Sequence, residues 1–112
     1  MKSAITLCRV AEAAAGPFVF HQELGEGFAK AADHGFDAVE LFFPAPITHS
    51  VEEIKGLQDR HGLEVAAVGT GAGMVKHGLS LTDPDPARRK AAAEFVLSMV
   101  ELGGQLKAPA II

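Results

Sequence analysis

The sequence predicts an α/β protein built on a parallel sheet. Short apolar runs, typical of buried strands, alternate with segments whose apolar residues recur at helical spacing. The helix–strand unit that turns at Gly35 is repeated at Gly62, an offset of 27 residues, which is the size of a compact βα unit. Strands joined by helices run parallel, because each helix crosses over the sheet to reach the next strand.

Turn and capping residues set the bounds of about four strands and three helices. Gly35 and Gly62 are typical helix ends, Ser50 and Glu53 form a capping box at a helix start, and Asp85 is a candidate N-cap before a proline. In order, the expected elements are a strand at 3–8, a loop at 11–21, a helix at 23–34, a strand at 36–43, a helix at 50–61, a strand at 63–69, a loop at 71–86, a helix at 87–103 and a strand at 107–112.

The strand at 36–43 contains one charged side chain that requires an explanation. A period of two places Val39, Leu41 and Phe43 on one face, where they suit packing under helices, and Glu40 on the other. A carboxylate on the interior side of a central strand is costly unless it is paired or functional. Both an internal salt bridge and a role in a site therefore remain open for Glu40.

The glycine-rich segment at 69–73 resembles a dinucleotide-binding fingerprint, but its context differs. That fingerprint must run directly into a helix whose N-terminus receives the pyrophosphate, and no helix is expected here until about residue 86. We interpret residues 71–86 instead as a flexible substrate-covering loop, with Met74 as an apolar contact and Lys76 and His77 as polar ones. A surface loop without a chemical role is the alternative.

Composition excludes several classes of function. With ten Lys and Arg against fourteen Asp and Glu, the net charge of -4 leaves no cationic surface for nucleic acid. No apolar stretch approaches the roughly 18 residues of a membrane span. The single cysteine, Cys8, cannot form an intrachain disulfide, and Arg9 interrupts the only signal-like run, so a cytoplasmic location is expected. No two histidines have metal-ligand spacing on one element.

Three segments together resemble a known family. Residues 35–44 (GFDAVELFFP), 61–73 (HGLEVAAVGTGAG) and 76–85 (KHGLSLTDPD) are similar to the N-terminal half of sugar phosphate isomerase/epimerase proteins. These belong to the xylose isomerase-like TIM-barrel superfamily, with hydroxypyruvate isomerases, ketose 3-epimerases and inosose dehydratases as relatives. The resemblance implies that residues 1–112 are a single partial domain, the first half of a (β/α)8 barrel.

The same resemblance implies a function, and it indicates which part of the barrel supplies which residues of the site. Family members move a proton between carbons beside the carbonyl of a sugar or short hydroxyketone, using a divalent metal (Mn²⁺, Mg²⁺ or Co²⁺) held by two Glu, an Asp and a His. Those ligands come from later strands and would lie beyond Ile112. This chain alone is therefore expected to bind no metal and to be inactive. It would supply a substrate-pocket wall made of Glu40, Phe42, Thr70, Met74 and His77.

Other readings remain open at this stage. An open doubly wound sheet is complete at this length, so a flavodoxin-like binding module without catalysis is the main alternative. A subunit that works only with a separate C-terminal half is another. A half barrel would leave two strand edges unpaired, so a homo-oligomer formed through the exposed barrel edges is expected, with a small sugar or hydroxyketone as substrate and no nucleic-acid or membrane partner.

Overall fold

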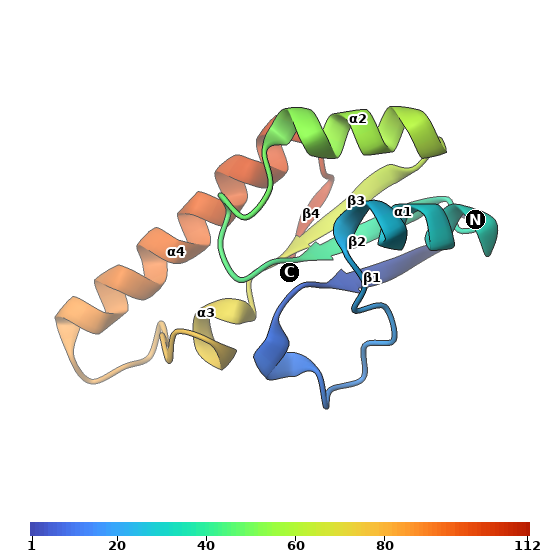
Figure 1. Cartoon of the computed structure of the whole chain (residues 1–112). Helices are drawn as coiled ribbons and strands as arrows, with labels where there is room; N and C mark the ends of the chain where they lie inside the picture. Colours follow the sequence, from blue (N-terminus) through green and yellow to red (C-terminus); the bar gives the residue numbers. More distant parts are fainter.

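In the computed structural model, which describes residues 1–112, four strands form one parallel sheet in the order β1-β2-β3-β4 (Figure 1). The strands are β1 (Ala4–Cys8), β2 (Ala38–Phe42), β3 (Glu64–Gly69) and β4 (Ala110–Ile111). All three pairings are parallel, as the alternation of strands and helices predicts. β4 is shorter than the predicted strand at 107–112, because only two of its residues pair with β3 and Pro109, just before them, has no backbone N–H to donate.

Three long helices cross between the strands, as the sequence predicts. They are α1 (Leu24–Asp33), α2 (Val51–His61) and α4 (Pro86–Gln105). Two short elements were not expected: a 3₁₀ turn, η1 (Ala11–Ala13), and a four-residue helix, α3 (Ala72–Val75). The prediction that no helix lies between the glycine-rich segment at 69–73 and residue 86 is therefore wrong. The turn of α3 is closed by backbone hydrogen bonds from Val75 and Lys76, and its Gly73 lies against the ring of Phe95 in α4.

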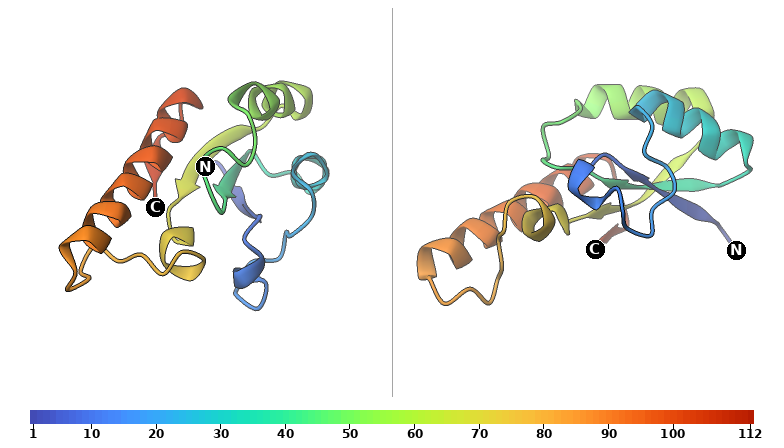
Figure 2. Two further views of the ribbon diagram at one scale, coloured as in Figure 1. Left: turned by 60° about the vertical axis from the view of Figure 1, so that its left-hand side comes forward. Right: turned by 60° about the horizontal axis from the view of Figure 1, so that its bottom comes forward.

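All three long helices pack on one face of the sheet (Figure 2). The predicted inward set of Val39, Leu41 and Phe43 is fully buried there, in one cluster with side chains from every long helix. The helical members of that cluster are Leu24, Phe28, Ala31, Ile54, Leu57, Met99 and Leu102. A doubly wound sheet carries helices on both faces and reverses its strand order, whereas here the order is sequential and the cover is one-sided. This is the arrangement of half a TIM barrel, and it excludes the flavodoxin-like alternative.

Capping follows the predicted residues with one exception. Ser50 Oγ accepts a hydrogen bond from the Glu53 N–H at 3.0 Å, and Asp85 caps α4 through the Ala87 N–H at 2.9 Å. The reciprocal half of the capping box does not form, because the Glu53 carboxylate pairs with His49 Nδ1 at 3.0 Å. Gly62 ends α2 with φ of 65°, a left-handed conformation that favours glycine.

The opposite face of the sheet carries no long helix; only the short α3 and the loop after β1 reach it, over Cys8 and Phe42 at its carboxyl end. Its side chains are small apart from Glu40, Phe42 and Glu64. A bulge in β3 shifts the pairing by one residue, so that Ala67 rather than Ala66 stands beside Glu40. The residues of this uncovered face are Ala4, Thr6, Cys8, Ala38, Glu40, Phe42, Glu64, Ala67, Gly69 and Ala110. β1 and β4 each pair with one neighbour only, so both outer edges of the sheet are open. None of the helices is both long and apolar enough to cross a membrane.

Candidate functional site

Three loops meet at the edge where the parallel strands end. They follow β1, β2 and β3, and in Figure 1 the first of them and α3 lie together at this end of the sheet. Lys76 Nζ pairs with Glu12 Oε1 at 3.0 Å and joins the third loop to the first. His77 Nε2 lies 2.8 Å from the Pro44 carbonyl oxygen and joins the third loop to the second. These contacts anchor the segment that the sequence alone indicated to be a flexible cover.

Glu40 lies on the uncovered face without a partner. Its carboxylate makes no hydrogen bond and no ion pair within the chain, so the internal salt bridge considered from the sequence does not form here. Its Oε1 reaches toward the end of β3, 3.7 Å from the point that a Cβ on Gly69 would occupy. Thr6 stands beside it in register on β1. The carboxylate is half-buried and free to accept hydrogen bonds.

Phe42 is sealed rather than open. Its side chain is 6% exposed and belongs to a small cluster with Cys8, Val10 and Ala72. The ring of Phe18, from the loop after β1, lies over it with ring centroids 5.1 Å apart. Phe42 therefore forms an apolar floor between the sheet and the loops, and Cys8 is buried within the same cluster.

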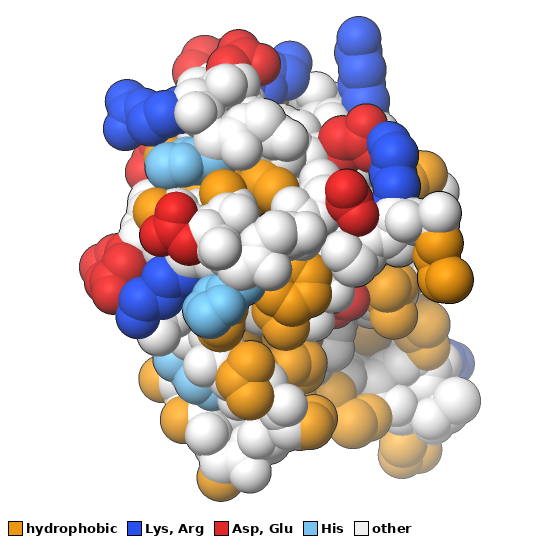
Figure 3. Space-filling model, turned by 90° about the vertical axis from the view of Figure 1, so that its right-hand side faces the viewer, with side chains coloured by type: hydrophobic (Ala, Val, Ile, Leu, Met, Phe, Trp, Pro, Cys, Tyr) orange, Lys and Arg blue, Asp and Glu red, His pale blue; other side chains and the backbone are white.

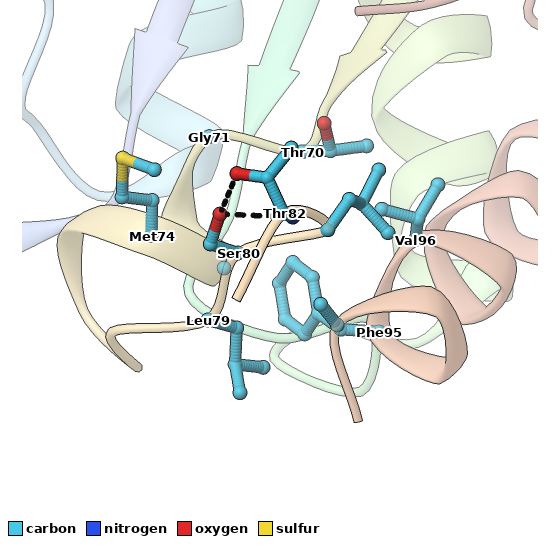
Figure 4. Close-up of a pocket in the computed structure, with 11 residues that line it drawn as sticks. Thr70, Gly71, Met74, Leu79, Ser80, Thr82, Phe95 and Val96 are labelled. Atoms are coloured by element: carbon cyan, nitrogen blue, oxygen red, sulfur yellow. Dashed lines mark hydrogen bonds between the residues drawn. The ribbon is translucent and has the colours of Figure 1, made fainter. Parts of the chain in front are cut away.

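Thr70 and Met74 line a separate pocket of about 270 Å³ between α3, residues 79–82 and α4 (Figure 4). Thr70 Oγ1 donates to the Ile112 carbonyl oxygen at 2.9 Å, which fixes its hydroxyl. In Figure 4 the ring of Phe95 lies on the α4 side of this pocket, while Ser80 and Thr82 bond to each other across from it at 3.0 Å. The Met74 side chain is largely exposed.

The five predicted pocket residues thus fall into three places. Glu40 and Phe42 lie on the uncovered sheet face, and Thr70 and Met74 line the pocket beside α4. His77 lies outside that pocket, with its ring 5.4 Å from that of Phe95. All five are at or near the carboxyl ends of β2 and β3, where barrel enzymes place their sites.

A comparison with protein families now decides the fold family. The family model of the xylose isomerase-like TIM barrel matches residues 28–112, from within α1, through β4, to Ile112. The chain belongs to this family. No curated protein matches the chain. The superfamily resemblance inferred from the three sequence segments is confirmed.

Two residues at this edge of the barrel wall were missed from the sequence. Arg9 directly follows β1; its Nη1 donates to the carbonyl oxygens of His21 and Gln22, and its Nη2 pairs with Glu23 at 2.7 Å. The rule that α/β proteins place sites at the carboxyl ends of strands could have found it. Phe95 carried no such signal, because within the helix sequence it is one more apolar residue of a packed face.

The residues of this barrel half do not by themselves fit a divalent metal. Nowhere in residues 1–112 do three His, Cys, Asp or Glu side chains come together. The nearest approach is the pair of His49 and Glu53, and protein sites for such metals require more ligands than a single pair.

The pairing of Glu12 with Lys76 gives a prediction for pH dependence. The hydrogen bond from Lys76 lowers the pKa of Glu12, so the stabilising contact is present at neutral pH and is lost as the pH falls through the lowered pKa. We expect the Lys76 amide resonance to shift with a midpoint below the ordinary glutamate pKa of about 4.3. An NMR titration from pH 6 to pH 2 measures it; Glu12→Gln should abolish the transition, and a midpoint above the ordinary value would contradict the contact.

Proposed function

We propose that residues 1–112 form a single partial domain that supplies one wall of the substrate pocket in a metal-dependent sugar or sugar phosphate isomerase or epimerase. The reaction class is proton transfer next to a carbonyl. The observation that carries the proposal is the unpartnered carboxylate of Glu40, which reaches toward the carboxyl end of a sheet face that no long helix covers. Membership in the xylose isomerase-like family supports it.

The chemistry of the wall suits a polyhydroxy ligand. A carboxylate accepts hydrogen bonds from hydroxyl groups. The ring of Phe42, sealed beneath Phe18, packs behind this carboxylate and supports the wall. When bound, the divalent metal would polarise the substrate carbonyl as a Lewis acid. We place its ligands and the acid and base in the later strands that the family's barrel contains, so the chain alone is proposed to be inert. A cytoplasmic setting is part of the proposal, supported by the lone, buried thiol of Cys8.

Ligand titration tests the wall. Adding D-fructose to the ¹⁵N-labelled chain should shift the amide resonances of Thr6, Glu40 and Gly69 and leave those of α2 unchanged. Shifts confined to other parts of the chain, or none at all, would overturn the proposal. A second measurement tests the inert part: with Mn²⁺ and a panel of ketoses in deuterated water, no exchange at C2 or C3 is expected, and substantial exchange by this chain alone would contradict it.

We also propose that the chain self-associates through its open barrel edges. β1 and β4 present unpaired backbone groups, and the carboxyl edge exposes the apolar side chains of Val19, Met74 and Val75. Figure 3 shows hydrophobic side chains gathered in the lower part of one face, with charged ones mainly above them. The homo-oligomer would shield both features.

Sedimentation measures this self-association. A dimer or larger species is expected, and Ala110→Lys, which places a charge on the β4 edge, should weaken it. Ala87→Lys, at an exposed position of α4, is the matched control and should leave the assembly unchanged. A monodisperse monomer of 11.7 kDa would contradict the proposal.

A further inference from the structure

The cationic groups at the carboxyl edge of the sheet are already paired, and the one guanidinium donor without a partner, Arg9 Nε, is buried. Arg9 Nη2 pairs with Glu23 at 2.7 Å, and its Nη1 donates to the backbone carbonyl oxygens of His21 and Gln22. Lys76 pairs with Glu12 at 3.0 Å. The His77 ring nitrogen Nε2 lies against the Pro44 carbonyl oxygen. The loops after β1, β2 and β3 therefore hold no free positive charge for a phosphate group.

Glu40 is the opposite case, because its negative charge has no partner. Its register partner on β3 is Ala67, yet its Oε1 lies near Gly69, which pairs with Phe42. The carboxylate therefore leans along the strand, toward the edge where the loops gather. At this edge of the wall, the charge that remains uncompensated is negative.

Thr6 adds a second free polar group beside this carboxylate. It is half-buried, and its hydroxyl makes no hydrogen bond within the chain, in contrast with that of Thr70. Thr6 and Glu40 are register partners on neighbouring strands, which lie about 4.8 Å apart in a sheet. A carboxylate that only accepts and a hydroxyl that donates or accepts can bind two adjacent hydroxyl groups of one small ligand.

We propose that Glu40 and Thr6 bind the uncharged, hydroxyl-bearing end of the substrate and that this wall rejects a phosphate group. The inference rests on the proposed function and deepens it by naming the substrate chemistry that the wall accepts. Hydroxyl groups donate charge-assisted hydrogen bonds to the carboxylate. A phosphate offers only acceptors and negative charge, and no free cation stands near to offset the repulsion.

A pair of three-carbon probes tests the inference, because so small a ligand cannot hold its phosphate far from the carboxylate. The ¹⁵N-labelled chain is titrated with dihydroxyacetone and with dihydroxyacetone phosphate at matched ionic strength and pH 7.5. We expect dihydroxyacetone to shift the amide resonances of Thr6 and Glu40. We also expect it to bind with an affinity at least tenfold higher than that of dihydroxyacetone phosphate. Equal or tighter binding of the phosphate would overturn the inference and leave the proposed function standing.

Substitutions then identify the group responsible. In Glu40→Gln, which keeps the size of the side chain and removes its charge, the affinity ratio of the two probes should fall toward one. Thr6→Val should weaken both probes and preserve the ratio. Glu52→Gln, at an exposed carboxylate of α2 without an ion pair, is the control and should change nothing. A ratio unaffected by Glu40→Gln would overturn the inference; no shift at Thr6 or Glu40 with either probe or with D-fructose would instead overturn the proposed function.

Discussion

Replacing Phe43 with alanine is expected to lower the free energy of unfolding by about 3–5 kcal/mol. The Phe43 side chain is completely buried on the helix-covered face, in the cluster that joins the sheet to α1, α2 and α4. Truncation to alanine removes the transfer free energy of the ring and leaves a cavity that neighbouring side chains fill only in part. Because domains have a total stability of about 5–15 kcal/mol, this loss is a large fraction of the free energy of unfolding.

Urea unfolding, followed by circular dichroism at one fixed protein concentration, measures the effect of Phe43→Ala. Phe43→Leu keeps most of the volume and should cost less than about 1.5 kcal/mol. Leu97→Ala removes a side chain that is 64% exposed on α4, and its effect should stay within about 0.5 kcal/mol. Similar midpoints for Phe43→Ala and Leu97→Ala would show that the helix-covered face is not the main core.

Local patterns in the sequence were sufficient for the helix-covered face. Alternation along β2 assigned Val39, Leu41 and Phe43 to one side, and the structure buries all three there. Gly62 marked the end of α2 because a left-handed residue after a helix is a local requirement. These features depend on a few neighbouring residues, and a single sequence displays them directly.

Features that depend on distant contacts could not be predicted in the same way. The single turn of α3 depends on Phe95 of α4 packing against Gly73, and neither residue carries a sign of the other. The bulge at Ala66 decides that Ala67 shares a face with Glu40, although the strand sequence reads as an uninterrupted apolar run.

The candidate site shows the same division. The rule that α/β proteins place sites at strand ends drew attention to His77, alternation along β2 to Glu40, and the family resemblance to Thr70, and the structure places all three at or near the carboxyl edge of the sheet. It did not reveal that Phe18 would cover Phe42, or that Lys76 would be neutralised by Glu12. Both contacts join residues far apart in the sequence, and they determine which groups stay free for a ligand.

Gly69→Ala is expected to destabilise the chain by about 1–3 kcal/mol and to disturb the position of Glu40. A Cβ at Gly69 would lie 2.9 Å from Phe42 Cδ2 and 3.7 Å from Glu40 Oε1. The Phe42 ring cannot easily move away, because Cys8 and Val10 are packed in the same cluster and Phe18 lies over it. Urea unfolding measures the loss of stability, and the D-fructose titration should show smaller shifts at the Glu40 amide.

Gly56→Ala is the matched control, because the same atom is added where nothing meets it. Gly56 lies inside α2 with no heavy atom within 4 Å of the new Cβ, and alanine is the better helix former by roughly 0.5–1 kcal/mol. The two glycine substitutions should therefore change stability in opposite directions, and only Gly69→Ala should alter the ligand-induced shifts. If both substitutions raised the unfolding midpoint, Phe42 could not be closely packed against Gly69 at the end of β3. The explanation given for the position of the Glu40 carboxylate would then fail as well.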